Sequence, residues 1–526
     1  MLVIALASIV SMAITLPTSD DAVVMMTELQ ARPVLNDDQK AKVDPPETAL
    51  LSKKDVEATD PTSKEASEIV VPPDILAKAE LGDHFETVNL DRPDTHSAYG
   101  NEDAKSFHSV TGNAEDAGGG GTGGVGMEDL IGVGAGGTRG TGGGFGGGDG
   151  TGTGVQSGAG HGSFGNRNGG GRRLMVKKHG GSKATESAVD VALRWLAYHQ
   201  EADGHWDSLK YGASKKCDTA MTGLATLAFL GAGNSERVGP WKDNVKRAIG
   251  WFKGMQADNG MIYDKTDTAS YGPGYGCAIA TLAVCDAAGM GNIKETKAMG
   301  QKAIDYCTEL HQTGEASDKL GWRYGAKDKS DDISVSGWFI MACKSAKVAG
   351  LHVNPMAFDG AIRYLDKCEK KVNDAIPGVD SSYGPPSEYI YNPLGGQLGI
   401  SPCTDAIGNL CRQFTGVPKE NLQSSVALFV KKYHTPKWDA NGGNNLYYWY
   451  YGTLCVFQQG GDLWKEWNES MKPALCDSQC KAGDDTGSWT PGTSEHEKCW
   501  GRVGETALCT LCLEVYYRYV QLNADK

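Results

Sequence analysis

The sequence predicts an all-α fold, an (α/α)6 toroid of six helix pairs closed into a ring, over residues 182–526. A pattern of an aromatic residue, Gln and Gly recurs with a spacing of 56 residues, which is typical of repeat architectures. Each recurrence is followed by a run that is apolar nearly all round, and such a helix has to be buried. Strand signals are scarce, so we expect no strands beyond short hairpins. An N-terminal apolar segment and a disordered acidic and Gly-rich region precede the ring.

Composition is uneven along the chain. Residues 1–117 hold 22 of the 65 acidic side chains but only 9 of the 51 basic ones, and all 12 Trp and 14 Cys lie at or after Trp195. Most of the net charge of −14 therefore belongs to the first 117 residues. This distribution excludes a uniformly acidic globule, a polytopic membrane protein and a basic nucleic-acid binder, so no nucleic-acid partner is expected.

Residues 1–17 form an apolar segment that is short for a transmembrane helix. A cleaved secretory signal and a membrane anchor both remain open. No Lys or Arg precedes the segment, although positive charge normally orients one, and the first basic residue is Arg32. Residues missing before Met1 would complete an anchor. Both alternatives predict a membrane-anchored or secreted protein, with the ring outside the cytoplasm and the membrane as a partner.

Two further segments separate this end from the ring. Residues 18–117 are acidic and poor in apolar side chains, so they cannot repay the entropy of ordering and are expected to be disordered. Residues 118–181 are expected to form a Gly-rich linker, because they contain neither a GxxxxGK[ST] phosphate loop nor a Gly-X-Y period. The linker ends in a basic patch, residues 171–179, which is either a contact for anionic lipid or polymer or a solvated collar.

The first two repeats are the clearest. Their matching positions are Trp195, Gln200, Gly204 and Trp206 in the first copy and Trp251, Gln256 and Gly260 in the second. Later copies are weaker, with Trp322 in the third unit and Trp489 in the sixth. The apolar runs that follow are residues 219–231, 279–289, 334–350, 404–416, 447–460 and 505–520, and several end in Gly as a helix C-terminus does. Because these runs have no polar face, the ring places them inside and the other helices outside.

These residues resemble the QW motifs of terpenoid cyclases and, more broadly, the prenyltransferase and squalene-oxidase repeat family, over about residues 187–520. Val191 replaces the motif's basic residue in the first copy, and Ile262 replaces its final Trp in the second. The resemblance implies a toroid in which the Gln and Trp residues tie neighbouring outer helices together and have no catalytic role. It implies little about activity, since the same toroid serves unrelated functions.

The catalytic signatures of this family are missing or altered. Its cyclases protonate an alkene through D-x-D-D, whereas Asp328, Asp331 and Asp332 give D-x-x-D-D. Asp331 and Asp332 are candidate acids, and the alternative is that Asp at this helix start is a cap. The sequence has no D-D-x-x-D, no Asp-x-Cys zinc pair and no thioester motif, so no cofactor is expected.

Candidate ligand-binding residues fall near the starts of the inner helices, which all open on one mouth of a toroid. They are Asp218, Tyr275, Trp338, Tyr383, Asp405, Tyr447, Trp449 and Glu505. Two interpretations remain open for the aromatic members. Either they line a rim that binds a sugar or an isoprenoid, or they fill the core of the ring.

Most cysteines occupy apolar helix positions, where a buried thiol is expected. The exception is the long turn of the last unit, which contains Cys476, Cys480, His496 and Cys499. Three Cys and one His satisfy the ligand count of a tetrahedral zinc site. One disulfide with a spare thiol is the favoured interpretation, a set of unpaired thiols is the next, and no metal is expected.

Intact repeats without catalytic signatures predict a binding or scaffold module, with an unknown protein, glycan or isoprenoid as its ligand. An isoprenoid-transforming enzyme that uses Asp332 or a neighbour as its acid is the first alternative. A polysaccharide-acting enzyme on the same fold is the second, and it requires two carboxylates at catalytic separation.

Overall fold

The computed structural model describes residues 164–521 except 270–271, 315–318 and 327, and at Glu495 and His496 it describes the backbone only. The expected anchor (1–17), the acidic region (18–117) and most of the Gly-rich linker lie outside these residues. All described residues belong to one compact unit of the chain. None of their helices is both long enough and apolar enough to cross a bilayer.

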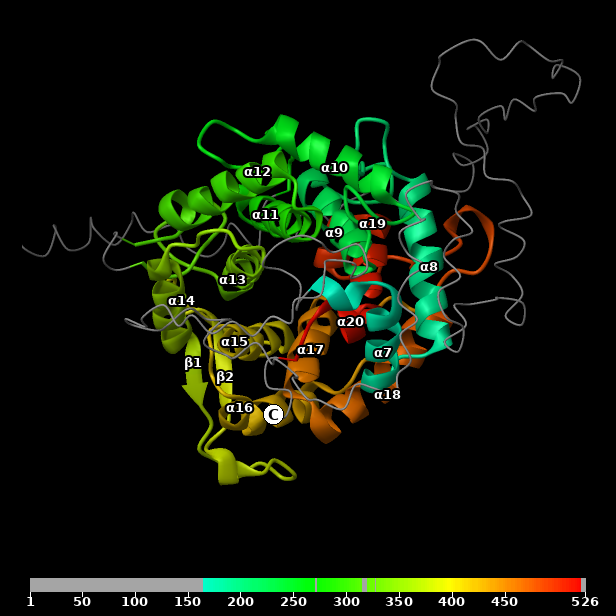
Figure 1. Ribbon diagram of the computed structural model, residues 1–526. Coiled ribbons are helices and arrows are strands. Elements are labelled where there is room, and N and C mark those ends of the chain that lie inside the picture. The colour runs from blue at the N-terminus through cyan, green and yellow to red at the C-terminus, as the bar shows by residue number, and fades with distance from the viewer. Residues whose placement is uncertain (1–163, 270–271, 315–318, 327, 522–526) are drawn as a thin grey trace, which may run out of the picture. The chain divides into compact units, whose positions relative to one another are not determined.

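Helices of two kinds alternate along the chain (Figure 1). The outer ones are α8 (Lys183–Tyr198), α10 (Lys242–Met255), α12 (Lys294–Asp305), α14 (Pro355–Cys368), α16 (Lys419–Tyr433) and α18 (Gly461–Ser478). The inner ones are α9 (Asp218–Gly231), α11 (Gly272–Gly291), α13 (Ile333–Val348), α15 (Pro402–Phe414), α17 (Leu446–Gln459) and α19 (Glu495–Leu513).

The inner helices form a closed ring. Along the chain each packs against the next, from α9 through α11, α13, α15 and α17 to α19, and α19 packs back on α9. Each outer helix lies against two consecutive inner helices, as α10 does against α9 and α11. The described chain is therefore a helix-rich α/α toroid, which confirms the predicted fold class at this level.

Burial separates the two layers. Every residue of α9 and of α17 is buried, whereas α10 buries mainly the face formed by Val245, Ala248 and Trp251 and their neighbours. Small residues let the inner helices approach closely. A Cβ atom added to Gly223 of α9 would lie 2.7 Å from the Ile279 side chain of α11. This close contact is why an all-apolar, small-residue-rich run packs in the inner layer.

The last part of the expected linker is structured. Its residues form the short 3-10 helix η4 (Gly165–Arg167) and the helix α7 (Gly169–His179), and both pack against α20 (Val515–Arg518). The Phe164 ring lies against Gly289 near the end of α11, and Arg167 Nη1 donates to the carbonyl of Leu230 near the end of α9 (3.3 Å). Residues 164–179, which we call the end plug, thus lie at the C-terminal end of the inner helices.

A small antiparallel sheet interrupts the helices between α14 and α15. Its order is β1-β2-β3, from β1 (Glu369–Lys371), β2 (Ser387–Asn392) and β3 (Gln397–Ile400). Glu369 pairs with Tyr389, and Ile390 pairs with Ile400. The short hairpin expected from the sequence is β2–β3, and β1 adds one more strand to it. β2 packs against α13 and α15, so it reaches the starts of two inner helices.

Candidate functional site

Asp332 stands at the start of α13, at the end of the ring opposite the end plug. Its Oδ1 accepts the backbone N–H groups of Ser334 (2.8 Å) and Val335 (3.0 Å), which makes it the N-cap of this helix. Its Oδ2 accepts a hydrogen bond from the Tyr391 hydroxyl, and that hydroxyl lies 2.6 Å from the Tyr324 hydroxyl. The carboxylate is fully buried, and both of its oxygens are engaged.

The tyrosines around Asp332 stay protonated at neutral pH. Burial first, and the Asp332 carboxylate second, raise the pKa of Tyr324 to about 12 and also raise the pKa of Tyr391. Tyr275 lies with its hydroxyl 2.6 Å from Ser334 Oγ, and burial raises its pKa as well. This mouth of the ring therefore presents neutral hydroxyl groups around one carboxylate.

Asp331 accepts hydrogen bonds from other groups than its neighbour Asp332 does. It accepts the backbone N–H of Gly321 (3.1 Å) and the Thr313 hydroxyl, and it is fully buried. Burial raises the pKa of its carboxyl group. Its contacts fix the turn that leads from the third outer helix to α13.

Asp218 is the first residue of α9, but its carboxylate does not cap that helix. Asp218 Oδ1 accepts the Ser208 N–H (2.8 Å) and the Ser208 hydroxyl (2.7 Å). The cap comes from Asp267, whose two oxygens accept the N–H groups of Asp218 (2.9 Å) and Thr219 (3.1 Å). Sequence reasoning missed Asp267, because it caps a helix that begins 49 residues earlier.

Among the described side chains, the one grouping of metal-type ligands consists of Asp218, Asp264 and Asp267. The Lys216 ammonium already lies 2.9 Å from Asp264 Oδ2 and 3.4 Å from Asp218 Oδ2. A cationic partner for two of the three carboxylates is therefore present in the chain itself. The third carboxylate, Asp267, is engaged in capping α9.

Asp405 lies in the first turn of α15 and is buried. It accepts the backbone N–H of Tyr389 (2.7 Å) and the Tyr433 hydroxyl (3.1 Å). Burial raises the pKa of this carboxyl group to about 7, against the opposing effect of these two hydrogen bonds. Asp405 and Asp332 contact neighbouring positions of β2, since Tyr389 and Tyr391 are two residues apart on that strand.

Glu505 lies on α19 inside the ring and is fully buried. Its Oε1 accepts the N–H of Gly492 (3.2 Å), and its Oε2 has no hydrogen-bond partner among the described groups. Burial, with the nearby Glu497 carboxylate as a second cause, raises the pKa of Glu505 well above its usual range. Burial thus disfavours the charged form of this carboxyl group.

Aromatic side chains fill the middle of the ring. The Trp338 indole N–H donates to the Tyr447 hydroxyl (2.9 Å), and its ring stacks on Tyr450 with centroids 5.3 Å apart. Trp449 is buried beside Trp438. Trp338, Tyr447 and Trp449 are thus buried inside the ring. Tyr383 differs, because it is 53% exposed in η6 (Ser381–Tyr383), outside the ring.

The space left at this mouth is small. A cavity of about 60 Å³ lies between α9, α11 and α19, and Met221, Tyr275 and Trp500 are among its walls. About 10–15 Å³ of such volume holds one water molecule, so this cavity accommodates a few waters. Sites for drug-sized ligands measure about 300–1,000 Å³.

The repeated Gln residues join neighbouring outer helices. Gln200 Nε2 donates to the carbonyls of Gly204 (2.9 Å) and Asn244 (3.0 Å), and Asn244 lies in the first turn of α10. Gln256 does the same to Gly260 (3.2 Å) and to Met299 of α12 (3.0 Å). Each of these two Gln side chains thus links one outer helix to the next outer helix along the chain.

The Trp residues after the turns close the ends of the outer helices. The indole N–H groups of Trp206, Trp322 and Trp489 donate to the carbonyls of Leu196, Cys307 and Leu475 at 2.8, 2.8 and 2.9 Å. Trp195 donates to the carbonyl of Asp484 (3.1 Å), and Trp251 stacks on the His205 ring. All five Trp side chains thus contact neighbouring elements of the fold.

Two further Gln residues make the same kind of contact as Gln200 and Gln256, and the sequence analysis did not identify them. Gln312 Nε2 donates to the carbonyls of Leu320 (2.7 Å) and Ala357 (2.9 Å), and Gln479 Nε2 donates to those of Gly487 (2.9 Å) and Ala188 (2.8 Å). Gln479 therefore ties the last unit to α8 and closes the outer layer. The spacing of 56 was a usable signal, because Gln312 follows Gln256 by that number.

The candidate metal ligands of the last unit do not come together among the described side chains. All fourteen cysteines are free thiols, and most are buried. Cys480 Sγ lies 3.6 Å from Thr490 Oγ1 and from Arg502 Nη1, whereas the Cys499 carbonyl accepts from the Cys217 thiol (3.2 Å). Cys476, Cys480 and Cys499 do not make a three-ligand group, and the side chain of His496 lies outside the described residues.

Comparisons with known proteins identify no family. No family model matches the chain, and no curated protein matches it either. The solved structures that are similar include an α-amylase from Clostridium perfringens, with 14% identity over 63% of this chain and 97% of that one and a TM-score of 0.43.

Two others are a glycoside hydrolase family 76 mannosidase from Bacteroides thetaiotaomicron (13% identity, 64% and 98% coverage, TM-score 0.42) and a type II terpene cyclase from Scytonema (10%, 63% and 97%, 0.38). Similarity at this level assigns neither an activity nor a ligand. The toroid itself rests on the packing of this chain's own helices.

Proposed function

We propose that residues 182–526 form an (α/α)6 toroid of the prenyltransferase and squalene-oxidase repeat type that acts as a binding or scaffold module. The observation that carries the proposal is the filled interior of the ring. Trp338, Tyr447 and Tyr450 occupy the place where a cyclase would need an empty chamber, and the cavity beside them measures about 60 Å³.

The hydrogen bonds and the burial of Asp332 also support a binding or scaffold module. An acid that protonates an alkene has to present a proton to an open chamber. Asp332 instead accepts two backbone N–H groups and a tyrosine hydroxyl, and it has no exposed surface. This carboxylate thus serves helix α13 and the position of β2.

Turnover assays test this proposal. The purified full chain is incubated with squalene and with geranylgeranyl diphosphate, and the products are followed by mass spectrometry. We expect no product from either substrate. Formation of a cyclised or transferred product that disappears in Asp332→Asn, while the exposed Asp374→Asn variant keeps it, would replace the binding proposal with the isoprenoid enzyme.

A polysaccharide-acting enzyme is the second candidate, and one observation favours it. Asp405 has a pKa raised to about 7, as a general acid requires, and a second carboxylate, Asp332, contacts the same strand two residues along. Both carboxylates are buried in this structure, so a glycan reaches them only if β2 moves.

A glycan panel decides between the two candidates. Reducing-end release is measured on mannan, starch, pectin and xylan with the full chain, Asp405→Asn and the exposed control Asp374→Asn. Hydrolysis that Asp405→Asn abolishes and the control retains would establish the enzyme. Release equal to a protein-free blank on all four polymers leaves the binding module as the function.

We further propose that residues 1–17 hold the ring outside the cytoplasm, as a membrane anchor or a cleaved signal, with residues 18–163 as a tether. Support comes from the apolar run of residues 1–16 and the acidic and Gly-rich composition that follows. Protease added to intact cells should degrade a C-terminal tag on this chain. Protection of the tag until the cells are lysed would contradict the proposal.

A further inference from the structure

The helix α7 of the end plug presents one exposed face, at the end of the ring that we call the plugged end. Its opposite face is buried, with Val176 at 1% exposure, where the helix packs against α20. Leu174, Lys177 and Lys178 are exposed, and Leu174 keeps 61% of its surface. Because residues three and four apart on a helix are neighbours, these three side chains share the face that points away from the ring.

The charge of this part of the chain has one sign. Residues 164–185 contain six Lys or Arg residues and no Asp or Glu. Two of the six, Arg167 and Arg172, pair with buried carboxylates of the ring at 3.1 and 2.6 Å. Lys177 and Lys178 make no ion pair within the described part of the chain. The positive charge on the exposed face of α7 is therefore not compensated by the protein.

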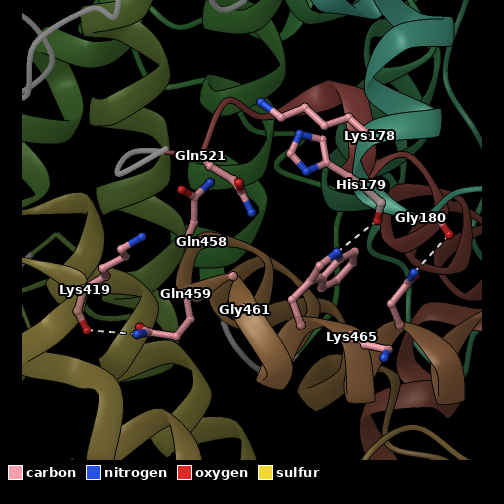
Figure 2. A pocket seen from close by; sticks show the side chains of 12 residues that line it. Lys178, His179, Gly180, Lys419, Gln458, Gln459, Gly461, Lys465 and Gln521 are labelled. Atoms are coloured by element: carbon pink, nitrogen blue, oxygen red, sulfur yellow. Dashed lines mark hydrogen bonds between the residues drawn. The ribbon is translucent and has the colours of Figure 1, made fainter. Parts of the chain in front are cut away.

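The surface beside α7 adds no acidic group next to this face. A cavity of about 580 Å³ separates the end of α7 from the starts of α16 and α18. Its lining includes Lys178, Lys419 and Lys465 and contains no acidic residue (Figure 2). The first turns of α16 and α18 carry Glu420 and Asp462 outside this lining, so the charge of those two helices is mixed. The excess of positive charge here is therefore that of α7.

An anionic membrane surface matches this face in charge and in chemistry. Lysines beside an exposed apolar side chain are typical of helices that lie on such a surface, where the ammonium groups meet lipid phosphates and the apolar group enters the interface. A bilayer is broad, so the side chains need only point the same way and need not converge on one atom. The sequence spacing on α7 and the burial of its other face satisfy this condition.

The proposed function gives a reason for a membrane to be near this helix. Phe164, the first described residue, lies at the plugged end, and the proposed tether precedes it directly. A tether that keeps two surfaces close raises their effective concentration, so that weak contacts between them suffice. A flexible tether does not by itself orient the ring.

We infer that α7 docks the plugged end of the ring on an anionic membrane, with Lys177 and Lys178 at lipid phosphates and Leu174 in the interface. The inference rests on the proposed function for the presence of a membrane near the ring. In this orientation the mouth that carries Asp332 faces away from the lipid. Docking thus fixes the direction in which the binding module points.

Lysine footprinting of the full chain tests this docking. The chain is reconstituted with vesicles of phosphatidylcholine, with or without phosphatidylglycerol, and is treated with a membrane-impermeant acetylating reagent before mass spectrometry. Acetylation of Lys177 and Lys178 is normalised to that of Lys253, an exposed lysine on α10. We expect it to fall about fivefold or more when phosphatidylglycerol is present, and added salt should restore it.

Leucine variants test the apolar part of the contact. Leu174→Ser should weaken the protection of both lysines about fivefold, because it removes the side chain that enters the interface. Leu209→Ser is the matched control, since Leu209 is 51% exposed and lies before α9, and it should leave the protection unchanged. Equal effects of the two variants would show that Leu174 does not enter the lipid and would overturn this arrangement.

Two further outcomes overturn the inference. One is equal acetylation of Lys177 and Lys178 in the two kinds of vesicle. The other is protection by soluble polygalacturonate as strong as that by phosphatidylglycerol vesicles, which would make an acidic polymer the partner. Flotation with phosphatidylcholine vesicles reports separately on anchoring by residues 1–17. A chain that does not float with them lacks the anchor, and its lysines still report whether α7 docks on phosphatidylglycerol.

Discussion

Burial of the Asp405 carboxyl makes the stability of the protein depend on pH. Its pKa in the folded state is about 7, against 3.8 for an Asp carboxyl in water. The folded state therefore keeps this proton to a higher pH than the unfolded state. Its contribution to the free energy of unfolding is fully present below about pH 4 and falls as pH rises to about 7, by at most about 4 kcal/mol.

Asp405→Asn should remove this fall, because the amide cannot ionise. Relative to the wild type, the variant should gain stability steadily between pH 4 and pH 7 and change little above that. Urea unfolding at a series of pH values measures the difference. Asp374→Asn, on the exposed surface, should follow the wild-type profile. Parallel profiles for the wild type and Asp405→Asn would show that the buried carboxyl does not titrate in this range.

The fourteen free cysteines give a second test at the scale of single residues. Only Cys403, Cys476 and Cys480 are partly exposed, and the rest are buried. A thiol reagent should therefore label at most these three in the native protein and all fourteen after denaturation. A reductant should leave the melting temperature unchanged. A lower count in the denatured state, restored by reductant, would reveal a disulfide and support that alternative for the last turn.

At the scale of elements, the Gln residues act as joints between successive helix pairs. Gln312→Leu removes the donor to the carbonyls of Leu320 and Ala357 and leaves both in a buried setting. We expect a loss of about 1–3 kcal/mol in the free energy of unfolding. Asn373→Leu, which replaces an exposed amide between β1 and β2, should change it by less than about 0.5 kcal/mol. Equal effects of the two changes in urea unfolding would contradict the joint role.

The third repeat shows why the sequence revealed only some of these joints. Ala303 and Tyr306 follow their counterparts in the second repeat by 55 residues, whereas Gln312 follows Gln256 by 56. The extra residue is absorbed by η5 (Tyr306–His311), a π-helix that ends this outer helix. A pattern with fixed internal spacing places His311 where the Gln is expected. The insertion is therefore why the pattern did not identify Gln312, although Gln312 makes the same contacts as Gln256.

Other parts of the site depend on contacts that no local pattern contains. Inner helices such as α9, α11, α13 and α17 were predictable, because each carries a long run of apolar and small residues. Asp267 caps α9 from a distant turn, and Lys178 and Lys465, almost 300 residues apart, line one cavity at the plugged end of the ring. The helix α7 was likewise not predicted, because its glycines disfavour helix formation in isolation. In the folded protein, tertiary packing outweighs this effect.

At the scale of the whole molecule, the two ends of the ring differ in chemistry. One mouth carries Asp332 among neutral tyrosine hydroxyls. The other end carries the end plug and a cavity of about 580 Å³ whose lining includes Lys178, Lys419 and Lys465. Phe164, the first described residue, lies at the plugged end. The described part of the chain therefore begins at the end of the ring opposite Asp332.

A buried ion pair fastens the end plug to the ring. Arg167 is 3% exposed, and its Nη1 donates to Asp286 Oδ2 of α11 (3.1 Å), while Arg518 Nη2 lies 3.7 Å from the same oxygen. Arg167→Met leaves Asp286 buried with one cation fewer, and we expect a loss of about 3 kcal/mol or more in the free energy of unfolding. Lys177→Met, on the exposed side of α7, is the control and should have little effect.

A double-mutant cycle separates this ion pair from general packing. Arg167→Met, Asp286→Asn and the combined variant are compared with the wild type in urea unfolding. If the ion pair holds the plug, the double variant should lose at least about 1 kcal/mol less than the two single losses added together. Additive losses would mean that Arg167 stabilises the ring only through its carbonyl contacts and packing. The plug would then be held on α11 by packing, as between Phe164 and Gly289, and not by this ion pair.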